Sequence, residues 1–205
     1  MTDPTATLRR RDFWTRALAV VREWLSHPSQ VASVIPSFPS LTRTIAKRDC
    51  IRSARQMVDL GPGTGGTTER LLDTARHDCR VLAIEKTSGF IETLNAIGDP
   101  RLTVVQDDVV GLERILLMHE MKSPDVIISG IPFSSLDADT AQSAMKAIYR
   151  TLGDGGTFIA YQLRGHVAEY ARPLFGEPVA VQYVLLNLPP LRIFTWQKPS
   201  SHAAP

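Results

Sequence analysis

The sequence is poor in cysteine and in long apolar runs, and it contains no internal repeat. Its two cysteines, Cys50 and Cys79, belong to no CxxC or Cys/His pattern, which excludes a disulfide framework and a metal cluster and fits a reducing compartment. No apolar stretch approaches the ~18–20 residues that span a bilayer, and the N-terminus lacks the apolar core of a signal peptide. We therefore expect a soluble or peripherally attached protein that binds no metal.

Composition predicts one domain with an extension. Hydrophobic residues make up 43% of the 205, which is enough for one core, because a domain usually takes roughly 100–200 residues. Of the 23 Lys/Arg and 21 Asp/Glu, residues 1–48 hold eight and three, which leaves 15 and 18 for the remainder. This asymmetry indicates a polyanionic surface opposite the N-terminal segment, either membrane or nucleic acid. We expect an N-terminal extension over residues 1–50, one domain over 51–199 and a disordered tail over 200–205.

Short apolar runs alternate with amphipathic stretches from Gln56 onward, which predicts an α/β fold with a Rossmann-like, doubly wound sheet. The predicted strands are Gln56–Leu60, Arg80–Ile84, Leu102–Gln106, Asp125–Ser129, Gly156–Tyr161, Ala180–Leu186 and Leu191–Trp196. The predicted helices are Thr64–Ala75, Ser88–Ile97, Gly111–Met118, Asp137–Leu152 and Val167–Leu174. Only four residues separate the last two strands, too few for a crossover helix, so we expect them to form an antiparallel hairpin.

A glycine-rich turn follows the first predicted strand, where Gly61, Gly63, Gly65 and Gly66 stand between the strand and the next helix. Glycines allow a tight turn and a close approach to a ligand, and the helix N-terminus offers free N–H donors. The spacing also satisfies the dinucleotide fingerprint. Asp59 separates the two interpretations, because a carboxylate would repel a pyrophosphate but would pair with a cationic amino-acid group. The remaining alternative is a tight turn that binds nothing.

This turn resembles the D/E-x-G-x-G-x-G motif of class I methyltransferases, which implies S-adenosylmethionine as cofactor and a seven-stranded sheet ending in an antiparallel hairpin. The resemblance places Glu85 at the ribose hydroxyls, and Asp107 or Asp108 near the adenine amino group. A solvated helix-cap acid at Glu85 and an exposed turn at the two aspartates are the alternatives. The implied cofactor-binding residues are Asp59, Gly61, Gly63, Gly65, Glu85, Lys86, Asp107, Asp108, Val109 and Ser129.

Ser129-Gly130-Ile131-Pro132-Phe133 ends the fourth predicted strand, at the edge where open α/β sheets bind ligands. The segment is similar to the Asn/Asp-Pro-Pro/Ile-Pro-Tyr/Phe motif of adenine methyltransferases, in which the first side chain grips the target nitrogen. Gly130 occupies that gripping position and has no side chain to grip with. Phe133 either contacts the developing ammonium through a cation–π interaction or belongs to the core.

Together with Val31–Arg43, the Ser-Gly-Ile-Pro-Phe form resembles the bacterial phosphatidylethanolamine N-methyltransferase family, in which a Pro-Ser segment folds over the cofactor site. The resemblance implies methylation of phosphatidylethanolamine and its methylated intermediates, towards phosphatidylcholine. An rRNA adenine N6-dimethyltransferase, or an enzyme of another aminolipid such as ornithine lipid, is the alternative. Against RNA, Gly130 lacks the gripping amide and we expect no C-terminal RNA-binding domain. A cofactor-binding module without catalysis, or an NAD-binding protein, is a third interpretation.

The substrate side draws on further residues after the fifth predicted strand. Arg164 is either a phosphate clamp or a surface arginine, and His166 either takes the amine proton or is solvated. No catalytic residue is assigned; Tyr161 and His166 are the candidates for the departing proton. The candidate substrate-binding residues are Gly130, Ile131, Pro132, Phe133, Tyr161, Arg164 and Ser37.

A helix through Phe13–Leu25 would place tryptophans on an apolar face edged by arginines, a pattern typical of helices at a membrane interface. A helix packed on the core with its arginines in water is the alternative. We expect a cytoplasmic protein attached to the inner face of the cytoplasmic membrane, with an anionic membrane surface as partner. The candidate membrane residues are Arg9, Arg10, Arg11, Phe13, Trp14, Arg16, Leu18, Val21 and Trp24.

Overall fold

The computed structural model describes residues 39–185 and 190–200 of the chain. The strands are β1 (Gln56–Leu60), β2 (Arg80–Glu85), β3 (Leu102–Gln106), β4 (Val126–Ser129), β5 (Thr157–Gln162), β6 (Ala180–Val184) and β7 (Leu191–Gln197). The α-helices are α2 (Pro39–Ala46), α3 (Asp49–Ser53), α4 (Gly66–Thr74), α5 (Ser88–Asn95), α6 (Leu112–Met118), α7 (Ala138–Thr151) and α8 (His166–Phe175). Two short 3-10 turns, η1 (Val109–Gly111) and η2 (Phe133–Ser135), follow β3 and β4.

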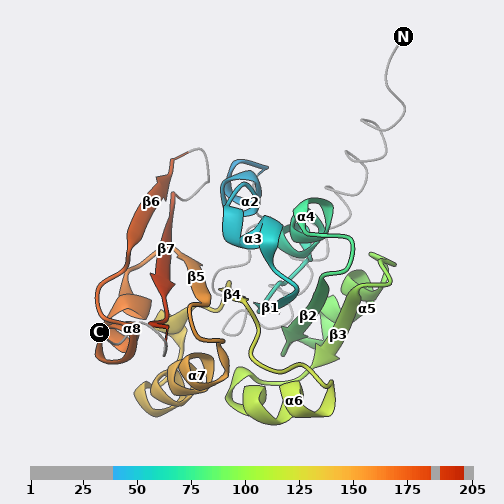
Figure 1. Cartoon of the computed structure of the whole chain (residues 1–205). Helices are drawn as coiled ribbons and strands as arrows, with labels where there is room; N and C mark the ends of the chain where they lie inside the picture. Colours follow the sequence, from blue (N-terminus) through green and yellow to red (C-terminus); the bar gives the residue numbers. More distant parts are fainter. Residues whose placement is uncertain (1–38, 186–189, 201–205) are drawn as a thin grey trace.

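The seven strands form one sheet in the order β3-β2-β1-β4-β5-β7-β6 (Figure 1). The first five strands are parallel, and β7 lies antiparallel between β5 and β6. The predicted α/β class, the seven strands and the antiparallel C-terminal hairpin are confirmed. Because β7 reverses direction, the start of β7 lies beside the end of β5, and Gln162 pairs with Arg192.

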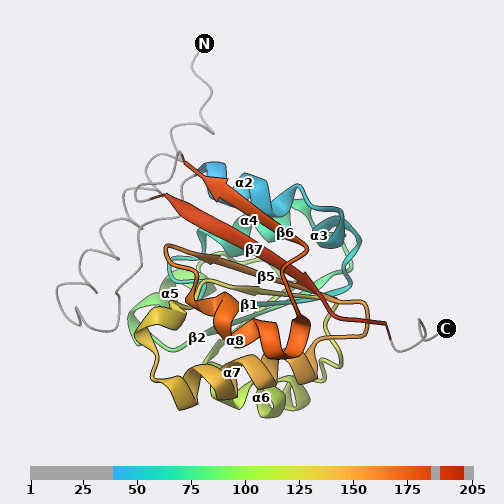
Figure 2. The ribbon, with the colours of Figure 1, turned by 90° about the vertical axis from the view of Figure 1, so that its left-hand side faces the viewer.

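Helices cover both faces of the sheet (Figures 1 and 2). On one face, α6, α7 and α8 bury a cluster that includes Phe158, Phe194 and Trp196 from the sheet. On the other, α2 and α4 pack over Met57 and Ile128. Strands enclosed on both faces need continuous apolar runs, which explains why Val126–Ser129 contains three consecutive branched aliphatic residues.

The boundaries of α4 and β6 differ from the prediction. The helix α4 begins at Gly66 and not at Thr64, because Gly65 has φ +80° and ψ 7°, a left-handed conformation that cannot be a helical turn. Strand β6 ends at Val184, whereas the prediction extended it to Leu186, which lies outside the described residues. Every other predicted element is present, with its ends shifted by at most two residues.

Helices α2 and α3 were not predicted. Leu41 and Ile45 of α2 are fully buried and pack in the cluster beneath α4. The expected Pro-Ser segment was placed over the cofactor site, yet its described part, from Pro39 onward, packs with α4 and is not among the residues that line the cavity described below. Arg48 joins this region to the C-terminal hairpin by donating to Thr195 Oγ1 and Gln182 Oε1, both at 2.6 Å.

In the part of the chain that the structure describes, no helix is long and apolar enough to cross a membrane. The expected helix Phe13–Leu25 and its arginines lie outside the described residues. So does Ser37, the one candidate substrate residue upstream of α2.

Candidate active site

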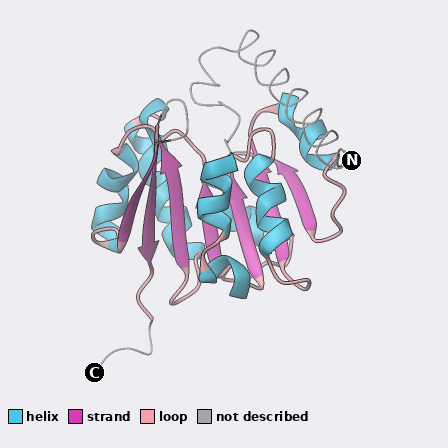
Figure 3. Cartoon of the chain, turned by 90° about the horizontal axis from the view of Figure 1, so that it is seen from above, coloured by secondary structure: helices cyan, strands magenta, loops and turns pink. Residues whose placement is uncertain are grey.

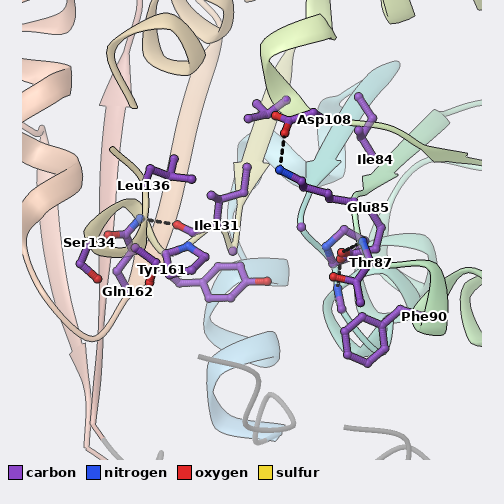
Figure 4. Close-up of a pocket in the computed structure, with 18 of the residues that line it drawn as sticks. Ile84, Glu85, Thr87, Phe90, Asp108, Ile131, Ser134, Leu136, Tyr161 and Gln162 are labelled. Carbon is purple, nitrogen blue, oxygen red and sulfur yellow. Dashed lines mark hydrogen bonds and ion pairs between the residues drawn. The ribbon is translucent and has the colours of Figure 1, made fainter. Parts of the chain in front are cut away.

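The carboxyl ends of the parallel strands lie along one edge of the sheet (Figure 3). A cavity of about 580 Å³ opens at this edge (Figure 4). Residues that follow β1, β2, β3, β4 and β5 all contribute to it, as the topology of an open α/β sheet requires. The predicted site residues that line it are Gly61, Gly63, Glu85, Lys86, Asp107, Asp108, Val109, Gly130, Ile131, Pro132, Tyr161 and Arg164.

The glycine loop between β1 and α4 is held to the end of β2. Gly61 and Gly63 have φ of +66° and +57°, where other residues would be strained. The amide of Gly61 donates to the carbonyl of Ile84, and the amide of Gly63 donates to Glu85 Oε2, each at 2.9 Å. The loop is therefore fixed against the next strand and turns its backbone toward the cavity.

Asp59 lies beneath this loop with its side chain fully buried. One carboxylate oxygen, Oδ2, accepts a hydrogen bond of 2.8 Å from Thr68 Oγ1 of α4, while Oδ1 has no partner among the described residues. Burial raises the pKa of Asp59 to about 7, against the lowering effect of the Thr68 hydrogen bond and with a smaller contribution from the nearby Glu85. A buried carboxylate oxygen without a donor is costly, and a cationic ligand would satisfy it.

Glu85 is also buried and lines the cavity wall (Figure 4). Its Oε2 accepts from Gly63, and its Oε1 accepts from the amide of Thr87 at 2.8 Å. Burial excludes the alternative of a solvated helix-cap acid. Each carboxylate oxygen can accept a further hydrogen bond, so the ribose contact stays a prediction compatible with this geometry.

The two aspartates after β3 have cationic partners. Asp107 accepts from Arg114 at 2.6 Å, which holds the pKa of that carboxyl below its ordinary value. Asp108 caps η1 by accepting from the amide of Val110 and forms an ion pair of 2.8 Å with Lys86 (Figure 4). Both carboxylates line the cavity, so which of them faces an adenine amino group stays open.

Gly130 and Tyr161 meet at the centre of the cavity floor. A Cβ added to Gly130 would overlap the Tyr161 hydroxyl and lie 2.8 Å from the carbonyl oxygen of Gly61. The phenol oxygen therefore occupies the space in which a side chain at position 130 would begin. Burial, followed by the negative charge of Asp59, raises the pKa of Tyr161, so the hydroxyl stays protonated at neutral pH. Tyr161 is accordingly a hydrogen-bonding group here and not the proton acceptor expected from the sequence.

Asp59 does not itself line the cavity, and neither do several other predicted residues. Phe133 is buried and packs toward Tyr170 of α8, with ring centroids 6.1 Å apart, so the core alternative holds and the expected cation–π contact lacks support. Ser129 is buried, and its hydroxyl accepts from the amide of Ile131 at 3.3 Å. His166 begins α8 with a buried Nδ1 that has no partner in the described chain, and it does not line the cavity. Gly65 contributes through its left-handed backbone conformation, which forms the turn before α4.

Sequence reasoning missed about half of the cavity lining. The missed residues are Pro62, Thr64, Ile84, Thr87, Phe90, Ser134, Ser135, Leu136, Gln162, Leu163 and Leu191. Most of them directly precede or follow a predicted residue at a strand end, a signal that was available. Gln162 contributes by donating from Nε2 to the carbonyl of Ile131 at 2.7 Å, which holds the β4 and β5 loops together.

The arrangement fits S-adenosylmethionine. A buried carboxylate with an unused oxygen suits the ammonium of an amino-acid portion, and it lies close enough to Glu85 to feel its charge. Ile84 and Phe90 lie on the side of Glu85, and Ile131 and Leu136 lie on the opposite side, so both sides of the cavity offer apolar surface for a flat ring (Figure 4). A dinucleotide pyrophosphate would instead face a loop backed by two carboxylates.

We predict that Asp59→Ala weakens binding of S-adenosylhomocysteine by about 1–3 kcal/mol, as expected for a lost charge-assisted hydrogen bond, measured by calorimetry. For the wild type, affinity should rise between about pH 5.5 and 7.5, because a carboxyl whose pKa is near 7 becomes the ionised partner of the ammonium only as pH increases. Asp73→Ala, a change of an exposed aspartate on α4, is the control. Unchanged affinity in Asp59→Ala would contradict this assignment.

We also predict that Gly130→Ala lowers the free energy of unfolding by about 1–3 kcal/mol, because the new methyl group overpacks against the Tyr161 ring. Adding Tyr161→Leu removes the obstructing phenol atoms and should recover part of that loss in denaturant titrations, while the close approach to the Gly61 carbonyl oxygen remains. Gly66→Ala is the matched control, since a Cβ there meets nothing within 4 Å. If Gly130→Ala is as stable as the control variant, the close contact does not exist.

Comparisons with known proteins agree with this geometry. Residues 39–145, more than half of the chain, match the family model described as ribosomal RNA adenine dimethylase. The chain is 29% identical over 170 residues to an ornithine lipid N-methyltransferase of Singulisphaera acidiphila, which covers 82% of this chain and 88% of that protein. It is 31% identical over 97 residues to ribosomal RNA small subunit methyltransferase A of Phenylobacterium zucineum, which covers 46% of this chain and 32% of that protein. The chain thus spans about a third of the length of that ribosomal RNA relative.

A solved structure shares the fold. The N-methyltransferase NodS from Bradyrhizobium japonicum WM9, in complex with S-adenosyl-L-homocysteine, superposes with a TM-score of 0.60 at 13% identity, over 87% of this chain and 99% of that one. Its likeness concerns the fold, while the matched family model covers the glycine loop, Glu85 and the Gly130 segment. The chain belongs to the ribosomal RNA adenine dimethylase family and is a class I, S-adenosylmethionine-dependent N-methyltransferase.

Proposed function

We propose that this enzyme methylates the amine head group of a membrane aminolipid. The observation that carries the proposal is the contact between Gly130 and Tyr161. At the position where adenine methyltransferases hold the target nitrogen with an amide or carboxylate, this chain has no side chain and a tyrosine hydroxyl takes the space. A flexible primary amine needs fewer fixed contacts than the edge of an adenine ring, and it suits this simpler floor.

The similarity to an ornithine lipid N-methyltransferase supports the same proposal, because it extends over most of both chains. The ribosomal RNA relative matches less than half of this chain. Phosphatidylethanolamine, with its methylated intermediates, and ornithine lipid are the two head groups we propose. Both present an amine near an anionic group, so one cavity chemistry serves either.

The residues of the chain would act mainly by positioning. S-adenosylmethionine, when bound, supplies an already activated methyl group. Asp59 and Glu85 hold the donor side, and the floor at Gly130 keeps the path to the acceptor clear. In-line placement and exclusion of water then account for catalysis without a strong base. A neutral amine takes the methyl group as the bond from that group to sulfur breaks, and afterwards loses its proton to water or to an anionic group of the lipid. The Tyr161 hydroxyl oxygen would orient the nitrogen by accepting a hydrogen bond from its N–H, which leaves the nitrogen lone pair free to attack.

Ribosomal RNA adenine methylation is the second candidate function, because the matched family model carries that description. The Ile131-Pro132-Phe133 triplet also resembles the adenine motif. Against it stands the floor of the cavity, since Tyr161 leaves no room for a gripping side chain at position 130.

We propose further that the N-terminal segment attaches the enzyme to the anionic inner face of the cytoplasmic membrane. The support is the sequence pattern of Phe13–Leu25, in which Trp14 and Trp24 share an apolar face edged by arginines. Such a helix would hold a peripheral enzyme beside lipid head groups.

Radiolabelled methyl transfer distinguishes the two substrate classes. We expect label in phosphatidylethanolamine or ornithine lipid and none in ribosomal RNA, because the cavity floor suits a flexible amine. A panel of purified head groups, including monomethylated and dimethylated ethanolamine lipids, identifies the acceptor and the number of transfers. Label in RNA alone would end the lipid proposal.

Replacing both interfacial tryptophans tests the membrane partner. We expect Trp14→Glu with Trp24→Glu to abolish cosedimentation with anionic liposomes, because two acidic side chains cannot enter the interface beside anionic lipids. Binding of S-adenosylhomocysteine should be unchanged. Cosedimentation at the wild-type level would remove the role of this segment.

A further inference from the structure

A row of exposed apolar side chains runs along the β6 strand. Val179, Val181, Tyr183 and Leu185 are 41–74% exposed, and their alternation in sequence places them on one face of the sheet. Val181 pairs with Phe194, whose side chain packs in the core beneath α8, so this row faces the same side as α8. Strand β6 is the edge of the sheet (Figure 2), so within the described chain no further strand flanks it. Solvent-facing strand residues are usually polar, and these are not.

The row leads to the mouth of the cavity. Arg192 pairs with Tyr183 on one side and with Gln162 on the other. Its guanidinium lies 5.5 Å from the centroid of the Tyr183 ring, and Nη1 lies 3.7 Å from where a Cβ of Gly165 would be. The loop after β5 is therefore beside the hairpin. Leu163 and Arg164 of this loop and Leu191 of the hairpin line the cavity.

The charges around this row are of one sign. Neither Arg164 nor Arg192 has a carboxylate partner among residues 39–185 and 190–200. Other arginines of this part of the chain do bind carboxylates or carbonyls, for example Arg80, Arg101, Arg114 and Arg172. The sequence from 178 to 200 contains no Asp or Glu. Two guanidiniums that have no carboxylate partner in the described chain, beside exposed aliphatic and aromatic side chains, form an amphipathic surface that is complementary to anionic head groups above an apolar layer.

We propose that this hairpin patch, made of Val181, Tyr183, Leu185, Arg192, Leu163 and Arg164, docks on an anionic lipid bilayer and presents the cavity mouth to the head groups. The inference deepens the proposed lipid methylation and rests on it. The apolar side chains enter the interface while the guanidiniums remain at the depth of the anionic head groups. A surface that binds RNA would carry more basic residues and aromatic side chains for base stacking, and exposed valine and leucine would contribute little to RNA binding.

A fluorescent label at the patch tests contact with the bilayer directly. The full chain carrying Cys50→Ser and Leu185→Cys is labelled with an environment-sensitive dye, since Cys79 is buried. Vesicles of phosphatidylcholine with phosphatidylglycerol should shift the emission to the blue. The matched control is Met118→Cys at the end of α6, which is equally exposed and apolar but lies at the opposite end of the sheet from the cavity. No shift at position 185, or an equal shift at both positions, would overturn the proposal.

Catalysis on a bilayer gives a second measurement. Tyr183→Glu with Leu185→Glu should lower methylation of an aminolipid embedded in anionic vesicles by about tenfold or more. Methylation of the same lipid in neutral detergent micelles, and binding of S-adenosylhomocysteine, should stay at the wild-type level. Leu117→Glu with Met118→Glu, at the opposite end of the sheet, should change neither rate. Equal loss in vesicles and micelles would contradict a docking role.

The same variants identify other occupants of the patch. A labelled chain that responds to ribosomal RNA and not to vesicles, or a dimer that Tyr183→Glu with Leu185→Glu converts to a monomer without changing vesicle binding, would overturn the proposal. Emission already blue-shifted before vesicles are added would mean that the chain itself covers the patch, and would overturn it as well. The dye reports bilayer contact without any methyl transfer. An enzyme that methylates no aminolipid yet shows the shift would refute the proposed substrate and leave the docking surface standing.

Discussion

The site depends on one buried carboxylate that the protein leaves half satisfied. Asp59 ends a central strand under the glycine loop, and only one of its oxygens has a donor, from Thr68. Burial raises the pKa of this carboxyl to about 7. The free enzyme is therefore destabilised by desolvation of a carboxyl group that has no cationic partner. Such a cost is retained where a ligand relieves it. The cationic amino-acid group that we predict to bind there would relieve this cost, next to a loop bent by left-handed glycines.

The rest of the cavity follows from the parallel sheet. Because five strands run in the same direction, their carboxyl ends bring Glu85, the Asp107–Asp108 pair and Gly130 to one edge, although up to 45 residues separate them in sequence. The reversal at β7 then adds a different chemistry to the same edge. It brings Leu191 and Arg192 beside the end of β5, so a donor site of buried acids adjoins a mouth of apolar and basic groups. The two halves of the transfer reaction are thereby separated by charge.

The sequence was sufficient for the sheet and for most of the residues that line the cavity at the ends of β1, β2 and β3, because both are encoded locally. Apolar runs of strand length, the short link before Leu191, and an acid followed by glycines can each be read within a window of a few residues. Residues 39–53 were harder, because α2 and α3 have only eight and five residues, too few to establish a helical period. Their helices are stabilised by packing of Leu41 and Ile45 against the face that α4 covers, a tertiary contact that no local pattern encodes.

The acceptor side shows the same limit more sharply. The sequence indicates that Gly130 lacks a gripping side chain, but it does not indicate what fills the space, because Tyr161 comes from the next strand, 31 residues later. The two positions are coupled by volume: a side chain at 130 requires a smaller residue at 161, and a tyrosine at 161 requires glycine at 130. A side chain at position 130 alone would clash with Tyr161, and a smaller residue at position 161 alone would leave a hole. Neither change alone therefore gives a floor that could hold adenine. The space available at position 130 is therefore a property of a pair of strands, and a motif confined to one strand determines only half of it.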